Sequence, residues 1–169
     1  ALTYLYCYNN QLTNLDVSGA TALTYLYCYN NQLTNLDVSN NTALFDLICQ
    51  NNQLTSLDVS GATALTYLYC HNNQLTSLDV SNNTALIRLW CHDNQLTSLD
   101  IRNGINTNFT YFDATNNPNL SCINVDDVVW ADTAWTVANG NIDSTMFFST
   151  NCSGGSTNGT VPTIDTAFI

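Results

Sequence analysis

The sequence predicts a β-rich solenoid, a right-handed stack of coils with parallel strands, extended segments on the back of each coil and little curvature. The motif A-L-x-x-L-x-C-x-x-N-Q-L-T-x-L-D-[VI] recurs every 21 residues, which is the signature of a repeat architecture. Its first half alternates apolar and polar residues with the period of a strand. The repeats are also rich in Thr, Tyr, Val and Asn, which favours strands over helices.

Five regular repeats, here called rows one to five, precede a degenerate sixth. Row six follows a two-residue insertion around Gly104, and Pro118 enters it directly after an asparagine. A single row cannot bury enough apolar surface to offset the entropy of ordering its backbone, so we expect each row to be stabilised by its neighbours. The regular rows begin at Ala1, Ala22, Ala43, Ala64 and Ala85.

Within each row the spacing L-x-x-L-x-C predicts a short strand with two different faces. In row one, Leu5 and Cys7 point into the coil, while Tyr4, Tyr6 and Tyr8 point outward. The continuation L-T-x-L-D-V repeats the spacing and predicts the second extended segment on the far side of the coil.

Charge and motifs exclude several functions. The chain has no Lys and no Glu, and Arg88 and Arg102 face thirteen Asp, giving a net charge of −11. Such a surface repels nucleic acid and anionic membranes. The sequence also contains no run of eighteen apolar residues that could span a bilayer. Nucleophile elbows, phosphate-binding loops and zinc-protease motifs are also missing from the sequence. We therefore expect neither an enzyme nor a cofactor.

The repeated residues L-x-x-L-x-C-x-x-N-x-L resemble the leucine-rich repeat consensus, and L-x-x-L-D-V is similar to the bacterial class with 21-residue repeats. The resemblance implies secretion and recognition, usually of proteins and sometimes of glycans. The repeats predict a solenoid over residues 1–121, and the resemblance implies a C-terminal cap over 122–152. The Ser-, Gly-, Thr- and Asn-rich start of residues 153–169 predicts a linker or tail. In the family the last polar consensus residue turns inward and hydrogen-bonds adjacent coils, a role that would belong here to Asn10, Asn31, Asn52, Asn73, Asn94 and Asn117.

The seven cysteines divide into two groups. One group recurs at a single inward position, where we favour a column of small buried hydrophobic side chains. Disulfides within the column are disfavoured because stacked cysteine side chains point in parallel, and a metal site is disfavoured because His71 and His92 face the other side of the strand. Cys122 and Cys152 flank the expected cap, and an exported protein would oxidise them to a disulfide. The column consists of Cys7, Cys28, Cys49, Cys70 and Cys91.

A second column carries one aspartate per row: Asp16, Asp37, Asp58, Asp79 and Asp100. A Ca²⁺ ion bound to Asp37, Asp58 and Asp79 would relieve their mutual repulsion. That repulsion is only about 1 kcal/mol per pair in water, so a solvated acidic face without a metal is the favoured interpretation.

All nine tyrosines occupy outward positions of the first predicted strand in their rows, and together they predict a ligand-binding face. We expect it to be centred on row three, where smaller side chains should leave a shallow notch, and Arg88 could pair with Asp113 at its far end. The alternative is that tyrosines only suit exposed strand surfaces. The candidate residues are Tyr4, Tyr6, Tyr25, Tyr27, Asp46, Ile48, Gln50, Tyr67, Tyr69, His71, Arg88 and Trp90.

Two functions remain open from the sequence. The first is an extracellular or cell-surface adhesion module that binds a protein or glycan through the tyrosine face. The second is a structural spacer, or an ice- or mineral-binding surface, that uses the Thr and Asp columns. Row one also begins in phase with the repeat, so its apolar residues predict an open edge through which copies could associate end to end.

Overall fold

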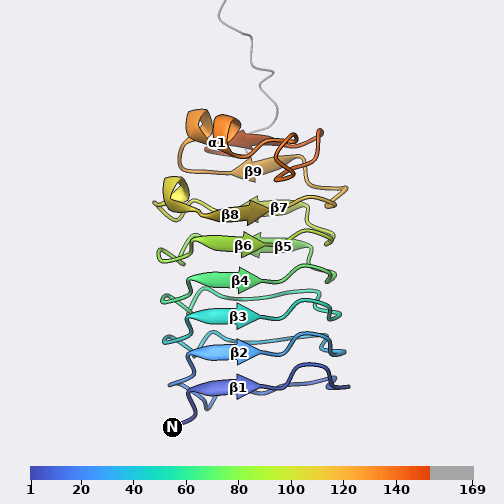
Figure 1. Cartoon of the computed structure of the whole chain (residues 1–169), viewed down its shortest axis with the longest axis vertical. Coiled ribbons are helices and arrows are strands. Elements are labelled where there is room, and N and C mark those ends of the chain that lie inside the picture. The colour runs from blue at the N-terminus through green and yellow to red at the C-terminus, as the bar shows by residue number, and fades with distance from the viewer. Residues whose placement is uncertain (153–169) are drawn as a thin grey trace, which may run out of the picture.

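The computed structural model describes residues 1–152, and the expected tail over residues 153–169 lies outside them. The chain forms a nearly straight stack of coils, as Figure 1 shows. Each row contributes one three-residue strand to a six-stranded parallel front sheet with the order β1-β2-β3-β4-β6-β8. The strands are β1 (Tyr4–Tyr6), β2 (Tyr25–Tyr27), β3 (Asp46–Ile48), β4 (Tyr67–Tyr69), β6 (Arg88–Trp90) and β8 (Tyr111–Asp113).

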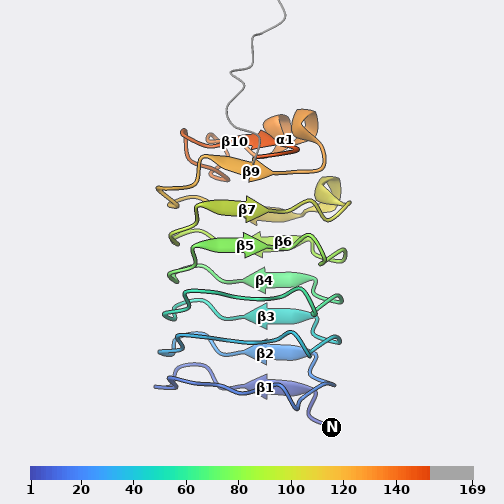
Figure 2. The ribbon, with the colours of Figure 1, turned by 180° about the vertical axis from the view of Figure 1, so that it is seen from behind.

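The back of the stack is extended, and it carries a second parallel sheet with the order β10-β9-β7-β5 (Figure 2). Rows one to three follow the same path with only one bridge, between Asp37 and Asp58. Regular rows have no helix on their back, so the predicted β-solenoid with extended backs is confirmed. The back strands are β5 (Ser77–Asp79), β7 (Ser98–Asp100), β9 (Cys122–Asn124) and β10 (Phe147–Ser149).

The front sheet keeps the register of the repeat. Tyr4 pairs with Tyr25, Leu5 with Leu26 and Tyr6 with Tyr27, and the same offsets continue up the stack. The inward leucines of rows one to four therefore each lie on the leucine of the next row, and Leu89 of row five lies on Phe112. The leucines of β2, β3, β4 and β6 are fully buried, whereas Leu2 in the first row is 49% exposed.

An asparagine column connects successive turns. Asn52 accepts a hydrogen bond from the Leu33 amide (3.0 Å) and donates to the carbonyls of Cys28 and Cys49 (3.1 Å each). The residue before each of these asparagines has a positive φ of 53–56°, a conformation that Asn and Asp adopt more easily than most residues. The segment C-x-[ND]-N, which becomes A-x-N-N in row six, thus turns the chain at the end of each front strand. The other inward asparagines are Asn10, Asn31, Asn73, Asn94 and Asn117, of which Asn10 in row one is exposed.

A second set of buried asparagines serves the opposite turn. Asn41 donates to the carbonyls of Val17 and Ala20, and Asn83 repeats these contacts two rows later with Val59 and Ala62. Rows one and three carry Gly-Ala where rows two and four carry Asn-Asn. The repeat unit at this turn is therefore a pair of rows.

The last coil is covered by segments outside the regular repeat. The insertion forms the 3₁₀ helix η1 (Asn106–Asn108), and α1 (Val128–Ala134) lies above it in Figure 1. Asp127 caps α1 by accepting a hydrogen bond from the Trp130 amide. Trp135 is buried against Phe112 with ring centroids 4.4 Å apart, so an aromatic cluster closes this end of the core.

Candidate binding face

The outward side chains of the front sheet form three columns, which together are called the aromatic face. The first column starts at Tyr4, the second at Tyr6 and the third at Tyr8. Rings of rows one and two are in contact in all three columns, with centroids 4.9, 4.8 and 4.6 Å apart, and the second-column pair is tilted by 30°. The spacing is that of neighbouring strands, so the sheet itself sets the distance between the rings.

Stacking decides which part of each ring a partner could reach. The first-column pair of rows one and two is inclined by 8° and the third-column pair by only 4°, so their flat faces cover each other. Tyr4, Tyr6 and Tyr8 are 55%, 54% and 41% exposed and present ring edges and hydroxyl groups. The aromatic face therefore exposes rows of phenol hydroxyl groups and ring edges to a partner. The flat ring faces, which nine outward tyrosines would otherwise expose, are largely covered by neighbouring rings.

The expected notch in row three is partly filled in the first column. Phe45, which takes the place of a threonine in most rows, lies 5.9 Å from Tyr25 and 5.2 Å from Tyr67, measured between ring centroids. The next residue, Asp46, is buried, with 8% of its surface exposed. Asp46 is thus not the open ligand carboxylate that the sequence predicts, because the side chains packed around row three bury it.

Asp46 is held by a tyrosine of the row below. The Tyr27 hydroxyl donates to Asp46 Oδ2 at 2.8 Å. Burial raises the pKa of Asp46, and the hydrogen bond from Tyr27 partly opposes that rise. Burial and the neighbouring carboxylate raise the pKa of the Tyr27 hydroxyl, which stays protonated. Tyr27 therefore has a structural contact as well as an outward ring.

The second and third columns are interrupted in row three. Ile48 lies between Tyr27 and Tyr69 in register, and Gln50 follows two residues later on the same side of the strand. Both side chains are half-buried. Two acceptor atoms of this row, Asp46 Oδ1 and Gln50 Oε1, are buried without a hydrogen-bond partner.

Ring contacts resume in rows four to six. Tyr69 stacks on Trp90 at 4.6 Å, and His71 stacks on His92 at 4.4 Å. Burial, reinforced by His92, lowers the pKa of His71 to about 4, so its imidazole is neutral near pH 7. His92 in turn lies 3.2 Å from a carboxylate oxygen of Asp113.

Arg88 does not form the suggested pair with Asp113. Its guanidinium carbon lies 5.2 Å from the centre of the Tyr67 ring, and its Nε donates to the Thr110 hydroxyl at 3.2 Å. The cation therefore rests on the aromatic face itself, because the register places it one strand from Tyr67.

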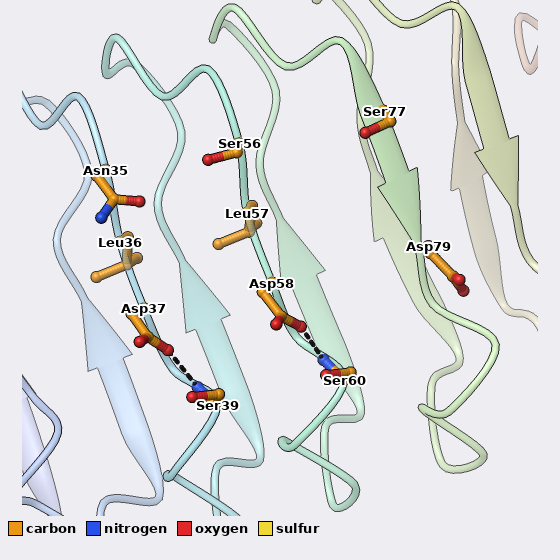
Figure 3. A pocket seen from close by; sticks show the side chains of 10 residues that line it. All are labelled: Asn35, Leu36, Asp37, Ser39, Ser56, Leu57, Asp58, Ser60, Ser77 and Asp79. Carbon is orange, nitrogen blue, oxygen red and sulfur yellow. Dashed lines mark hydrogen bonds between the residues drawn. The ribbon is translucent and has the colours of Figure 1, made fainter.

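The aspartate column lies on the back and lines an open hollow, shown in Figure 3. Asp37 and Asp58 accept hydrogen bonds from the backbone amides of Ser39 and Ser60, both at 2.9 Å. Side-chain and backbone hydrogen bonds from these serines lower the pKa of both carboxyls. The carboxylates thus cap turns, and no group of three metal-ligating side chains occurs among residues 1–152.

Comparison with known proteins assigns the family. A family described as leucine-rich repeats (two copies) matches residues 1–41 and 42–83. The functional domain of InlJ from Listeria monocytogenes, which includes a cysteine ladder, is 38% identical with a TM-score of 0.53, over 73% of this chain and 34% of that protein. The chain is a leucine-rich repeat protein.

Two further structures share the fold of this leucine-rich repeat protein. An internalin, inlF, from Listeria monocytogenes is 23% identical with a TM-score of 0.59, over 87% of this chain and 47% of that one. A leucine-rich repeat protein of Leptospira interrogans is 24% identical with a TM-score of 0.57, over 88% and 37%. The chain thus spans less than half the length of these relatives, and no curated protein matches it.

This similarity indicates a bacterial protein-interaction module, and leucine-rich repeat proteins are typically non-catalytic and without cofactors. In the part of the chain that the structure describes, no helix is long and apolar enough to cross a membrane. The neighbour with a cysteine ladder also matches the inward cysteine column found here. Burial raises the pKa of Cys28, Cys49, Cys70 and Cys91, so these thiols act as apolar core.

The disulfide between Cys122 and Cys152 is present, with Cα atoms 5.7 Å apart. It joins the start of β9 to the segment after β10, which is paired with β9.

Two structural features of the repeats escaped the sequence analysis, Phe45 and the second asparagine set. Both had a signal, because Phe45 breaks a position that is usually Thr, and Asn41 and Asn83 recur every 42 residues.

Proposed function

We propose that this leucine-rich repeat protein is an extracellular or cell-surface recognition module that binds a partner protein across the aromatic face. The observation that carries the proposal is the stack of outward rings on consecutive strands, with Tyr4, Tyr6 and Tyr111 each about half exposed. An aromatic surface that recurs on five of the six front strands is unusual for a part of a protein that contacts only water. Tyrosine is also enriched at protein interfaces because one side chain supplies apolar area and a hydroxyl.

Two further observations support this proposal. One is the 38% identity to the functional domain of InlJ, because leucine-rich repeat domains generally serve protein recognition. The disulfide between Cys122 and Cys152 suits an oxidising compartment, because cytosolic thiols are kept reduced. Glycans remain ligands to be tested, since the phenol hydroxyls can also bond to sugars.

The test compares binding of the chain and its variants to arrays of extracellular proteins and glycans. The face variant combines Tyr6→Ala with Tyr69→Ala, and it spares Tyr27 because that hydroxyl holds Asp46. We expect its affinity for a ligand found with the parent chain to fall at least about tenfold, roughly 1.4 kcal/mol. Circular dichroism should show an unchanged fold, because both rings point away from the core.

The matched control changes the back of the stack. Asp16→Asn combined with Asp79→Asn removes charge but keeps an oxygen that can accept the turn hydrogen bonds now made by Ser18 and Ser81. This variant should bind like the parent. Equal binding by the face variant would contradict the proposal, and loss of binding in the control would assign the ligand to the back hollow instead.

A further inference from the structure

The interruption of the aromatic columns in row three lies between rings that are otherwise regularly spaced. Tyr27 and Tyr69 are two strands apart in the second column, and Ile48 occupies the strand between them. Elsewhere in this column the ring centroids of rows one and two lie 4.8 Å apart, and those of rows four and five stack at 4.6 Å. A planar group lying over Ile48 would therefore be at stacking distance from a ring on each side.

The polar atoms of row three specify what that group should carry. Asp46 Oδ1 and Gln50 Oε1 are both hydrogen-bond acceptors, and neither has a partner. A buried acceptor without a donor is costly, and such an atom in a native protein calls for an explanation. The carboxylate of Asp46 also adds negative charge to this part of the face. The Tyr27 hydroxyl that donates to its other oxygen is neutral and does not compensate that charge.

The protein itself shows a guanidinium on this face. Arg88 is one strand from Tyr67 in register, and its guanidinium carbon lies 5.2 Å from the ring centre. This distance falls within the range of cation–π contacts. Since the chain has two basic residues against thirteen acidic ones, a basic partner would also be attracted over a longer range.

From these observations we propose that row three is the seat of an arginine side chain of the partner protein, stacked between Tyr27 and Tyr69 above Ile48. The inference rests on the proposed function and specifies the chemistry of its partner as a basic, arginine-containing segment. A guanidinium is planar and carries only donors, so it can stack on both rings, and the half-buried Gln50 side chain can turn outward to present its Oε1 to the guanidinium. A lysine ammonium matches the charge but not the planar shape, and a phenyl ring or a neutral sugar does not match the charge.

The experiment measures binding of fluorescent peptides to the whole chain by anisotropy at low and physiological salt. The probe alternates glycine with arginine, and matched peptides carry lysine or uncharged citrulline instead. We expect the arginine peptide to bind at least about fivefold more tightly than the lysine peptide at physiological salt, roughly 1 kcal/mol of discrimination. The citrulline peptide should be the weakest, because it keeps the planar shape without the charge.

The decisive variant fills the interruption. Ile48→Tyr restores the ring that four of the other five rows carry at this position. It should fold, with a melting temperature at or above that of the parent, and lose the preference for arginine over lysine. Gln50→Ala should reduce that preference by about threefold by removing an acceptor, and the back variant with Asp79→Asn should keep it.

The outcomes separate this inference from the proposed function. If array ligands lose affinity with the face variant but not with Ile48→Tyr, the aromatic face is the binding site and row three is not an arginine seat. Equal binding of arginine and lysine peptides would mean attraction by net charge alone and would overturn the inference. Binding of a neutral glycan to the face without arginine preference would also overturn it, and full binding by the face variant would refute both proposals.

Discussion

Two glycines in the same motif should respond in opposite ways to the same substitution. Gly19 and Gly61 both lie in the sequence Ser-Gly-Ala-Thr at the turn that ends rows one and three. A Cβ atom on Gly61 would lie 1.8 Å from the carbonyl oxygen of Ser39 in the row below, whereas a Cβ on Gly19 meets no atom within 4 Å. Neither glycine has a positive φ, so sterics rather than backbone conformation decide the outcome.

The magnitude follows from the distance. To reach even 3.0 Å, the shortest separation that real Cβ atoms adopt, the backbones of rows two and three must move apart by about 1.2 Å. Forcing such a shift into a packed stack costs about 2–3 kcal/mol. Gly19→Ala should instead stabilise by about 0.5 kcal/mol, because alanine restricts the unfolded chain without a clash.

Thermal and urea unfolding of the two single variants would measure this difference. For a chain of this size about 3 kcal/mol corresponds to a separation in melting temperature of roughly 6–12 °C. Gly61→Ser should behave like Gly61→Ala, since the clash comes from Cβ. Melting temperatures for Gly19→Ala and Gly61→Ala that agree within error would refute the reasoning that Gly61 is fitted closely against Ser39 of the row below.

Three further results are expected from the same structure. Asn52→Ala should lower the free energy of unfolding in urea by about 3 kcal/mol, because the buried Leu33 amide loses its acceptor. Asn10→Ala in the exposed first row should lower it by under about 1 kcal/mol, and similar losses for both variants would contradict the role of the inward asparagine column. Reducing the Cys122–Cys152 disulfide, which closes a loop with a sequence separation of 30, should lower stability by about 3–4 kcal/mol, and an unchanged urea midpoint would argue against a stabilising bridge. Finally, the free energy of unfolding should fall as the pH drops from about 6.5 to about 4, because the unfolded chain protonates His71 in this window while the folded chain keeps it neutral. In the variant His71→Gln the melting temperature should change less with pH across this range. The same pH dependence in that variant and in the parent would contradict the lowered pKa of His71.

Much of the fold could be predicted because each coil repeats one local pattern. The alternation around Leu5 and Cys7 specifies which residues point inward, and the 21-residue period places each row on the next, as the register of β1 to β8 shows. The disulfide was predictable as well, since Cys122 and Cys152 lie outside the period.

The candidate face was harder to predict because its properties depend on contacts between rows. The sequence places tyrosines outward, but it does not show that their flat faces are taken up by stacking on one another. It also suggested a notch at Asp46, but Asp46 is buried and the preceding Phe45 lies between two tyrosines. Arg88 likewise rests on Tyr67 rather than beside Asp113, because the ring is the nearer partner along the strand register.

The stack, its inward leucine, cysteine and asparagine columns, and the outward position of every tyrosine can be read from the chain alone, because period and alternation are local properties. Which surfaces and atoms those residues leave available depends on how the rows pack in three dimensions. Only in the folded stack do Asp46 Oδ1 and Gln50 Oε1 emerge as buried acceptors without donors, and only there does Gly61 meet Ser39 while Gly19 does not. Those outcomes depend on the distance of about 4.8 Å between neighbouring strands, which brings side chains 21 residues apart into contact.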